Sequence, residues 1–227
     1  VEPPFLPFDP DGDNGNVGAQ HTRLRDIPLR AIFPQVLTLL AICSGMTAIR
    51  FAVDGRLELA IGAIILAGFL DGIDGRVARF LKSSSRFGAQ MDSLADFVNF
   101  GVAPAMLLYF SLLNEIGPLG WLVGLVYAVC ACLRLARFNV MIDMPGSPVW
   151  QKDFFVGVPA PAAAGIALAP IYLLLLGVEA TDFFAGLACA YLLAVGLLMV
   201  SSVPTYAGKS IGQQIRREFV LPLLLLI

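Results

Sequence analysis

Long apolar runs recur along this chain, and they constrain its fold more than any other feature. Six runs are long enough to cross a bilayer, which takes about 20 apolar residues. They cover residues 33–53, 57–81, 93–113, 118–141, 155–177 and 183–204. Apolar residues make up 58% of the 227 and charged residues only 14%, whereas about a quarter of the residues are charged in an ordinary soluble domain. The sequence therefore predicts an all-α integral membrane protein.

The two ends of the chain differ from this apolar middle part. Residues 1–20 are rich in Pro, Gly, Asp and Asn, which predicts an irregular extension. Residues 21–32 mix arginines with Leu and Ile, as in an amphipathic segment lying on cytoplasmic headgroups. A seventh apolar run begins at Phe219 and is too short at Ile227 to cross, so we expect the native chain to continue. Residues 33–227 thus form one transmembrane domain, a polytopic helical bundle of six complete helices and a truncated seventh.

Positive charges are distributed unequally between the two sides that these spans define. Of the 15 Lys and Arg residues, only Arg50 and Arg56 fall on the side opposite the N-terminus. Cytoplasmic loops carry an excess of Lys and Arg, so we expect the N-terminus to be cytoplasmic. The net charge of -2 leaves no basic excess for binding nucleic acid.

Four carboxylates stand at the ends of the second and third runs, where isolated charges are unfavourable. Asp71 and Asp74 share one helix face, as do Asp92 and Asp96, because residues three or four apart are neighbours on a helix. The polar connection at 82–88 is long enough to reverse the chain and bring the pairs together. Crowded carboxylates repel one another, and one or two hard divalent cations would remove this repulsion.

The same stretch has room for a phosphate compound. Gly75 and Ala78 leave one helix face without bulk, and Arg79 offers a guanidinium group to a phosphate oxygen. Metal, bare backbone and arginine together indicate a diphosphate site. Two alternatives stay open: the acids pair with neighbouring basic residues at helix ends, or they belong to a cation or proton transporter.

The stretch also resembles a known signature, D-x2-D-G-x2-A-R followed by G-x3-D-x3-D, that of the CDP-alcohol phosphotransferase family. The matching residues are Asp71, Asp74, Gly75, Ala78, Arg79, Gly88, Asp92 and Asp96. The resemblance implies a membrane enzyme that moves a phosphatidyl or similar group from a CDP-linked donor to an alcohol and releases CMP. It also implies two Mg2+ or Mn2+ ions held by the four aspartates, with Asp96 as the proton acceptor. The implied contacts to the CDP-lipid are Thr38, Gly75, Ala78, Arg79 and Gly88.

Three further stretches look like one branch of the family, the membrane-embedded phosphatidylserine synthases of bacteria and archaea. They are RLARFN at 134–139, FVGVPAPAAAG at 155–165 and the S-x4-Y-x2-K pattern that ends at Lys209. This resemblance implies L-serine as the acceptor, with Arg134, Arg137, Asn139 and Lys209 around it. Glycerol 3-phosphate or inositol phosphate would also require basic residues, and choline would require aromatic or acidic ones. Gln35 departs from the branch, which usually has Asn after the proline.

The expected partners are CDP-diacylglycerol, L-serine, membrane lipids and a second copy of the chain. Small residues four apart, at Gly120 and Gly124 and at 186, 190 and 194, permit close helix packing within a protomer or across a homodimer. The four cysteines lie in apolar runs and are expected to be small buried groups. We expect the plasma (inner) membrane of a prokaryote, with the active site on its cytoplasmic side.

Overall fold

The computed structural model describes residues 29–81, 86–142, 154–201 and 204–206. The predicted N-terminal extension, most of the amphipathic segment, Lys209 and the seventh run lie outside these residues. Twelve elements are seen, in the following order: α1 (Leu29–Val53), α2 (Leu57–Phe80), α3 (Arg86–Asp96), the π-helix η2 (Phe97–Val102), α4 (Ala103–Ser111), the 3-10 helix η3 (Leu113–Ile116), α5 (Pro118–Ile142), β1 (Phe154–Val156), α6 (Ala160–Ala167), α7 (Ala169–Leu175), α8 (Asp182–Val200) and β2 (Pro204–Tyr206).

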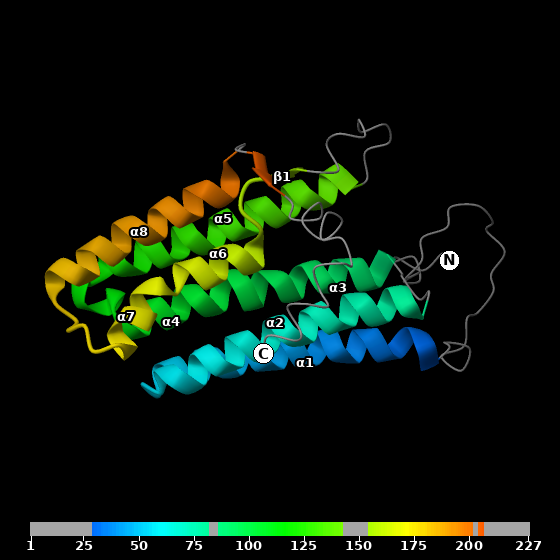
Figure 1. Cartoon of the computed structure of the whole chain (residues 1–227), viewed down its shortest axis with the longest axis horizontal. Coiled ribbons are helices and arrows are strands. Elements are labelled where there is room, and N and C mark those ends of the chain that lie inside the picture. The colour runs from blue at the N-terminus through cyan, green and yellow to red at the C-terminus, as the bar shows by residue number, and fades with distance from the viewer. Residues whose placement is uncertain (1–28, 82–85, 143–153, 202–203, 207–227) are drawn as a thin grey trace, which may run out of the picture.

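The helices form a bundle of antiparallel rods (Figure 1). Helices α1 and α2 pack along their length, and α5 pairs with α8 on the other side of the bundle. Between these pairs, α3, η2 and α4 follow one another as a single rod. This arrangement places the end of α2 and the start of α3 at the same end of the bundle as the start of α1.

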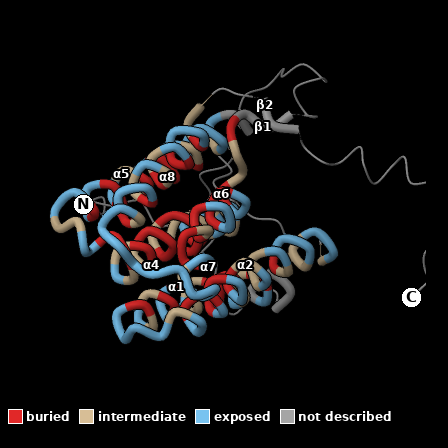
Figure 2. The backbone as a smooth tube through the Cα atoms, turned by 60° about the vertical axis from the view of Figure 1, so that its left-hand side comes forward, coloured by how far each residue is buried: buried red, intermediate tan, exposed pale blue. Residues whose placement is uncertain are grey.

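In the part of the chain that the structure describes, four helical segments are long and apolar enough to cross a membrane: Phe33–Val53, Phe87–Ser111, Pro118–Val140 and Asp182–Val200. Helix α2 is 24 residues long, but its acids and arginines keep it outside this group. The α6–α7 region is a shorter apolar stretch, Ala160–Leu175. Exposed residues line the outer faces of the helices and buried ones face inward (Figure 2). Many of the exposed side chains are large and apolar, including Phe69 and Leu197 at 64% exposure each, as in helices that contact lipid. The prediction of a helical membrane protein is thus confirmed. The predicted number of spans, six and a truncated seventh, is not.

The prediction for residues 155–177 was wrong in one respect, because no single helix covers them. The stretch begins as β1, which pairs antiparallel with β2, and it then forms the separate helices α6 and α7. Pro170 separates these helices because proline has no N–H to donate to the carbonyl of Ile166, four residues earlier. Across its described residues, the fold is therefore helical with one short two-stranded sheet.

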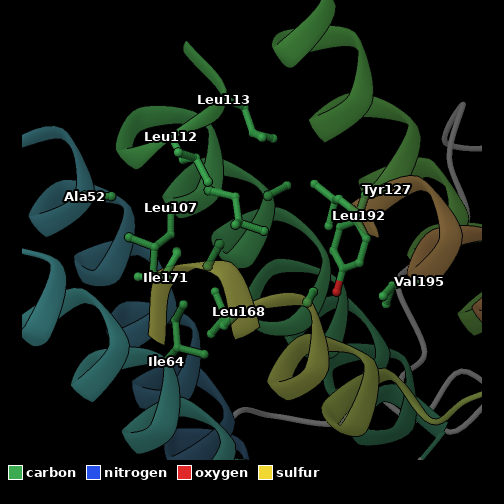
Figure 3. Packing of buried hydrophobic residues seen from close by; sticks show 14 of the residues in the cluster. Ala52, Ile64, Leu107, Leu112, Leu113, Tyr127, Leu168, Ile171, Leu192 and Val195 are labelled. Atoms are coloured by element: carbon green, nitrogen blue, oxygen red, sulfur yellow. The ribbon is translucent and has the colours of Figure 1, made fainter. Parts of the chain in front are cut away.

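The apolar core lies where α4 meets the other helices. Its largest fully buried side chains include Leu107 and Leu108 of α4, Ile171 of α7 and Leu192 of α8. Figure 3 shows Leu107, Leu168 and Ile171 packed together, with Tyr127 of α5 beside Leu192 and Val195. Alanines line the contact of α1 with α2, which lets the two backbones approach closely.

The small residues serve different contacts. A Cβ at Gly120 would overlap the Leu113 carbonyl, and one at Gly124 would meet Ala105 of α4, so this pair packs within the protomer. Residues 186, 190 and 194 are exposed on α8.

The prediction of buried cysteines holds for Cys130 only. Cys43 and Cys132 are exposed and Cys189 is intermediate, because a helix that contacts lipid is apolar on its outer face as well.

Candidate active site

Asp74, near the end of α2, is held by a threonine of α1. Its side chain is 3% exposed, and its Oδ2 accepts a hydrogen bond of 2.7 Å from the Thr38 hydroxyl. That hydroxyl also lies 3.1 Å from the Pro34 carbonyl. Because a hydroxyl has one proton and a bond to a carboxylate is the stronger, the proton belongs on the Asp74 side. Thr38 therefore orients the carboxylate of a predicted metal ligand, and its contact to the CDP-lipid stays a prediction.

Three of the four predicted metal ligands come together. Asp71 and Asp74 of α2 and Asp92 of α3 each offer a carboxylate oxygen, and these oxygens lie within 4.8 Å of one another. The Oδ1 atoms of Asp71 and Asp74 are buried and have no hydrogen-bond partner in the described part of the chain. Oxygens bound to one Mg2+ at about 2.1 Å lie at most about 4.2 Å apart, so small rotations would close the group around an ion. The donor set is the one that hard divalent cations prefer.

Asp96, one turn further along α3, lies beside this group. Its carboxyl group approaches that of Asp71, and its Oδ1 is buried without a described partner. Arg134 of α5 is near enough for its charge to interact with Asp96. Asp96 thus interacts both with Asp71 of the three-carboxylate group and with Arg134.

The predicted diphosphate contacts lie on the last turns of α2 and the first turns of α3. Gly75 is exposed, and no described atom lies within 4 Å of the position that a Cβ would take there. Ala78 is half-buried and Arg79 is exposed in the final turn. Gly88 is half-buried near the start of α3. The helix face beside the acids is therefore open, as an approaching diphosphate requires.

Of the predicted serine contacts that the structure describes, Arg134 is the one whose charge interacts with Asp96. Its Nε is buried and has no hydrogen-bond partner among the described residues. Arg137 donates from Nη1 to the Val200 carbonyl of α8 at 3.4 Å. The Asn139 amide donates to the Ser93 hydroxyl at 3.0 Å and so ties α5 to α3 next to Asp92. Within the described part of the chain, the Arg134 Nε thus has no hydrogen-bond partner, whereas Arg137 and Asn139 are engaged between helices.

Sequence reasoning missed two residues next to this site. Asn99 follows Asp96 by three residues and is fully buried, with no described partner for either atom of its amide. Tyr127 of α5 is also fully buried and donates to the Phe100 carbonyl at 3.1 Å. A signal for Asn99 was present, since a polar residue inside a membrane span marks a functional site.

Comparison with known proteins gives consistent matches. Residues 31–203 match the family model described as CDP-alcohol phosphatidyltransferase. Over 133 residues, 59% of this chain, the sequence is 53% identical to the CDP-diacylglycerol–serine O-phosphatidyltransferase of Mycobacterium tuberculosis, of which 46% is covered. The protein of that name from Helicobacter pylori is 34% identical over 176 residues, which cover 76% of this chain and 70% of that protein. The archaetidylserine synthase of Methanothermobacter thermautotrophicus is 36% identical over 173 residues, 75% of this chain and 67% of that protein. The chain spans about half the length of the mycobacterial relative.

Proposed function

Because the chain belongs to the CDP-alcohol phosphatidyltransferase family, we propose that it transfers the phosphatidyl group of CDP-diacylglycerol to the hydroxyl of L-serine, giving phosphatidylserine and CMP. The observation that carries this proposal is the group of three carboxylate oxygens within 4.8 Å, beside an open helix face. The names of the bacterial and archaeal relatives support serine as the acceptor.

The aspartates would hold the cation that the reaction needs. Asp71, Asp74 and Asp92 fit one Mg2+ or Mn2+, and Asp96 with Asp71 would complete a second site. When bound, such cations neutralise negative charge on the diphosphate and on the departing CMP. Thr38 acts here by fixing Asp74, since its hydroxyl is engaged with that carboxylate.

The other residues of the signature would bind the donor. Gly75, Ala78 and Gly88 border the open face on which the cytidine and diphosphate would lie. Arg79 would hold a phosphate oxygen with its guanidinium fork. The acyl chains would extend along the apolar outer surface of the helices.

In the proposed reaction, the serine Oγ attacks the lipid-linked phosphorus. A new bond forms between Oγ and phosphorus, the bond from phosphorus to the CMP oxygen breaks, and the hydroxyl proton passes to the Asp96 carboxylate. Arg134 would bind the carboxylate of serine, because its Nε is otherwise unpartnered among the described residues. Arg137, Asn139 and Lys209 remain predicted contacts of the acceptor.

The proposed membrane arrangement has six crossings, with α2 and the α6–α7 pair added to the four long apolar segments. At about 1.5 Å per residue, the 24 residues of α2 are long enough to span the hydrocarbon core. The distribution of Lys and Arg supports a cytoplasmic N-terminus and cytoplasmic acids, and the bacterial relatives support a prokaryotic plasma membrane. A homodimer remains a prediction.

The first experiment measures CMP release from CDP-diacylglycerol in detergent with Mn2+ or Mg2+. Serine, glycerol 3-phosphate, inositol phosphate and choline are offered in separate reactions, and we expect CMP with serine alone. CMP release with another acceptor would support the role of the aspartates and show that the proposed serine site is wrong. If folded protein that binds Mn2+ releases no CMP with any acceptor, the proposed enzymatic function is wrong and a cation transporter is favoured.

Asp96→Asn tests the proton acceptor in the same assay. We expect turnover to be lost while CDP-diacylglycerol binding is largely kept, because the amide cannot take up the proton. An equal loss of binding would instead make Asp96 chiefly a metal ligand.

A further inference from the structure

A π-helix begins directly after Asp96. At the end of this segment, η2, the Ala103 N–H donates to the Val98 carbonyl five residues earlier, instead of to the residue four earlier as in an α-helix. Single π turns are rare and occur frequently at functional sites. The wider turn changes the rotation of α3, which carries Asp92 and Asp96, relative to α4, which packs in the core.

A proline explains where the π turn lies. In an α-helix the Phe100 carbonyl would accept from residue 104, but that residue is Pro104, which has no N–H and whose ring would collide with this carbonyl. The carbonyl instead accepts a hydrogen bond of 3.1 Å from the Tyr127 hydroxyl of α5. Tyr127 is fully buried beside Leu192 and Val195 (Figure 3), where water cannot substitute for its hydroxyl.

Neighbouring helices hold η2 from other directions as well. On α1, a Cβ at Gly45 would overlap the side-chain oxygen of Asn99. On α2, a Cβ at Gly68 would lie 3.3 Å from the Phe100 ring. The π turn therefore sits in a closely packed site, in which Tyr127 makes the one side-chain hydrogen bond to a backbone carbonyl that the described residues show.

We propose that Tyr127 is a positioning residue for Asp96: by donating to the Phe100 carbonyl, to which Pro104 has no N–H to offer, its hydroxyl holds the π turn that directs Asp96 toward Asp71 and Arg134. This inference rests on the proposed function, in which Asp96 accepts the serine proton. Proton transfer requires close geometry, and a misplacement of about 1 Å can cost about a hundredfold in rate.

The chain contains a matched control for this device. Tyr191 of α8 donates to the Ile166 carbonyl at 2.9 Å, and residue 170, four positions after Ile166, is also a proline. In both places a tyrosine hydroxyl donates to a carbonyl four residues before a proline. The Tyr191 hydrogen bond lies at the break between α6 and α7, and not at the turn that follows Asp96.

The test compares Tyr127→Phe with Tyr191→Phe in the full chain, using CMP release, Mn2+ titration and thermal unfolding. For Tyr127→Phe we expect kcat at saturating Mn2+ to fall about tenfold, because one buried hydrogen bond is lost, while KM for CDP-diacylglycerol stays unchanged. For Tyr191→Phe we expect a lower Tm with unchanged kcat. Equal kcat values in the two variants, or a change in KM alone, would overturn the proposal.

A double variant separates positioning from stability. In Tyr127→Phe/Pro104→Ala the alanine supplies the missing N–H, so the protein folds even where Tyr127→Phe alone does not. We expect Tm to recover and kcat to stay low, because the turn can then close as an α-helix and redirect Asp96. Recovery of kcat together with Tm would show that Tyr127 only stabilises the fold.

Asp96→Asn, assayed alongside, distinguishes failure of this inference from failure of the proposed function. If Asp96→Asn remains active, the role of Asp96 as proton acceptor is wrong. If Asp96→Asn is inactive and Tyr127→Phe is normal, only the positioning inference is wrong.

Discussion

Thr38→Val removes the hydroxyl that orients Asp74 and keeps nearly the same side-chain shape. The lost hydrogen bond is 2.7 Å long and joins two side chains that are 5% and 3% exposed. A hydrogen bond to a charged group contributes about 1.5–3 kcal/mol. Since every 1.36 kcal/mol is tenfold in an equilibrium constant, we expect Mn2+ affinity to fall about 10- to 100-fold, as for other residues that orient metal ligands.

The assay is the Mn2+ dependence of CMP release, with the free Mn2+ concentration read by electron paramagnetic resonance. The Mn2+ concentration for half-maximal rate should rise, and saturating Mn2+ should restore most of kcat, because the acids themselves are intact. Far-ultraviolet circular dichroism checks that the helices are retained.

Thr47→Val is the matched control on the same helix. The Thr47 hydroxyl donates to the Cys43 carbonyl of its own helix at 2.6 Å and is exposed, so its removal leaves the acids untouched. If both variants shift the Mn2+ dependence equally, or neither does, the reasoning from the Thr38–Asp74 contact is refuted.

Three further predictions follow from the packing and the charges. Chelation of divalent cations with EDTA should abolish CMP release and added Mn2+ should restore it; activity that survives complete chelation would rule out the metal site. Gly45→Ala should destabilise the protein by about 1–3 kcal/mol, because its Cβ would overlap the Asn99 side chain. Gly62→Ala is the control, since no described atom lies within 4 Å of its Cβ, and it should be neutral or stabilising. Equal melting temperatures of the Gly45→Ala and Gly62→Ala variants would contradict this account. Arg134→Lys keeps the charge but loses the guanidinium fork, so KM for serine should rise about tenfold; an equal rise in KM for CDP-diacylglycerol would place Arg134 in the donor site.

Much of the site was predictable because its ligands are close in sequence. Asp71 and Asp74 lie on one helix, as do Asp92 and Asp96, and the packing of α2 and α3 brings Asp71, Asp74 and Asp92 together. The helix limits at 53, 57 and 118 also agree with the apolar runs. These features depend on local periodicity and turn composition, which a single sequence records.

Other features depend on contacts between distant segments. The role of Thr38 depends on Asp74, 36 residues away, and that of Tyr127 on Phe100, 27 residues away. The strands β1 and β2 are three residues each and pair across almost 50 residues of chain, so neither had a sequence signal of its own. Pro170 marked a helix break that the uniform hydropathy of the fifth run concealed.

By itself, the sequence determined that this chain forms apolar helices and carries two acidic pairs on neighbouring helix faces, because periodicity and hydropathy are local properties. The tertiary structure decided which side chains of α1 and α5 meet those acids, because the rotation and offset of each helix depend on small residues at distant contacts, such as Gly45 against Asn99. It also decided how the protein compensates for Pro104: a proline removes a hydrogen bond wherever it occurs, but only the packed bundle brings the Tyr127 hydroxyl to the carbonyl that needs it.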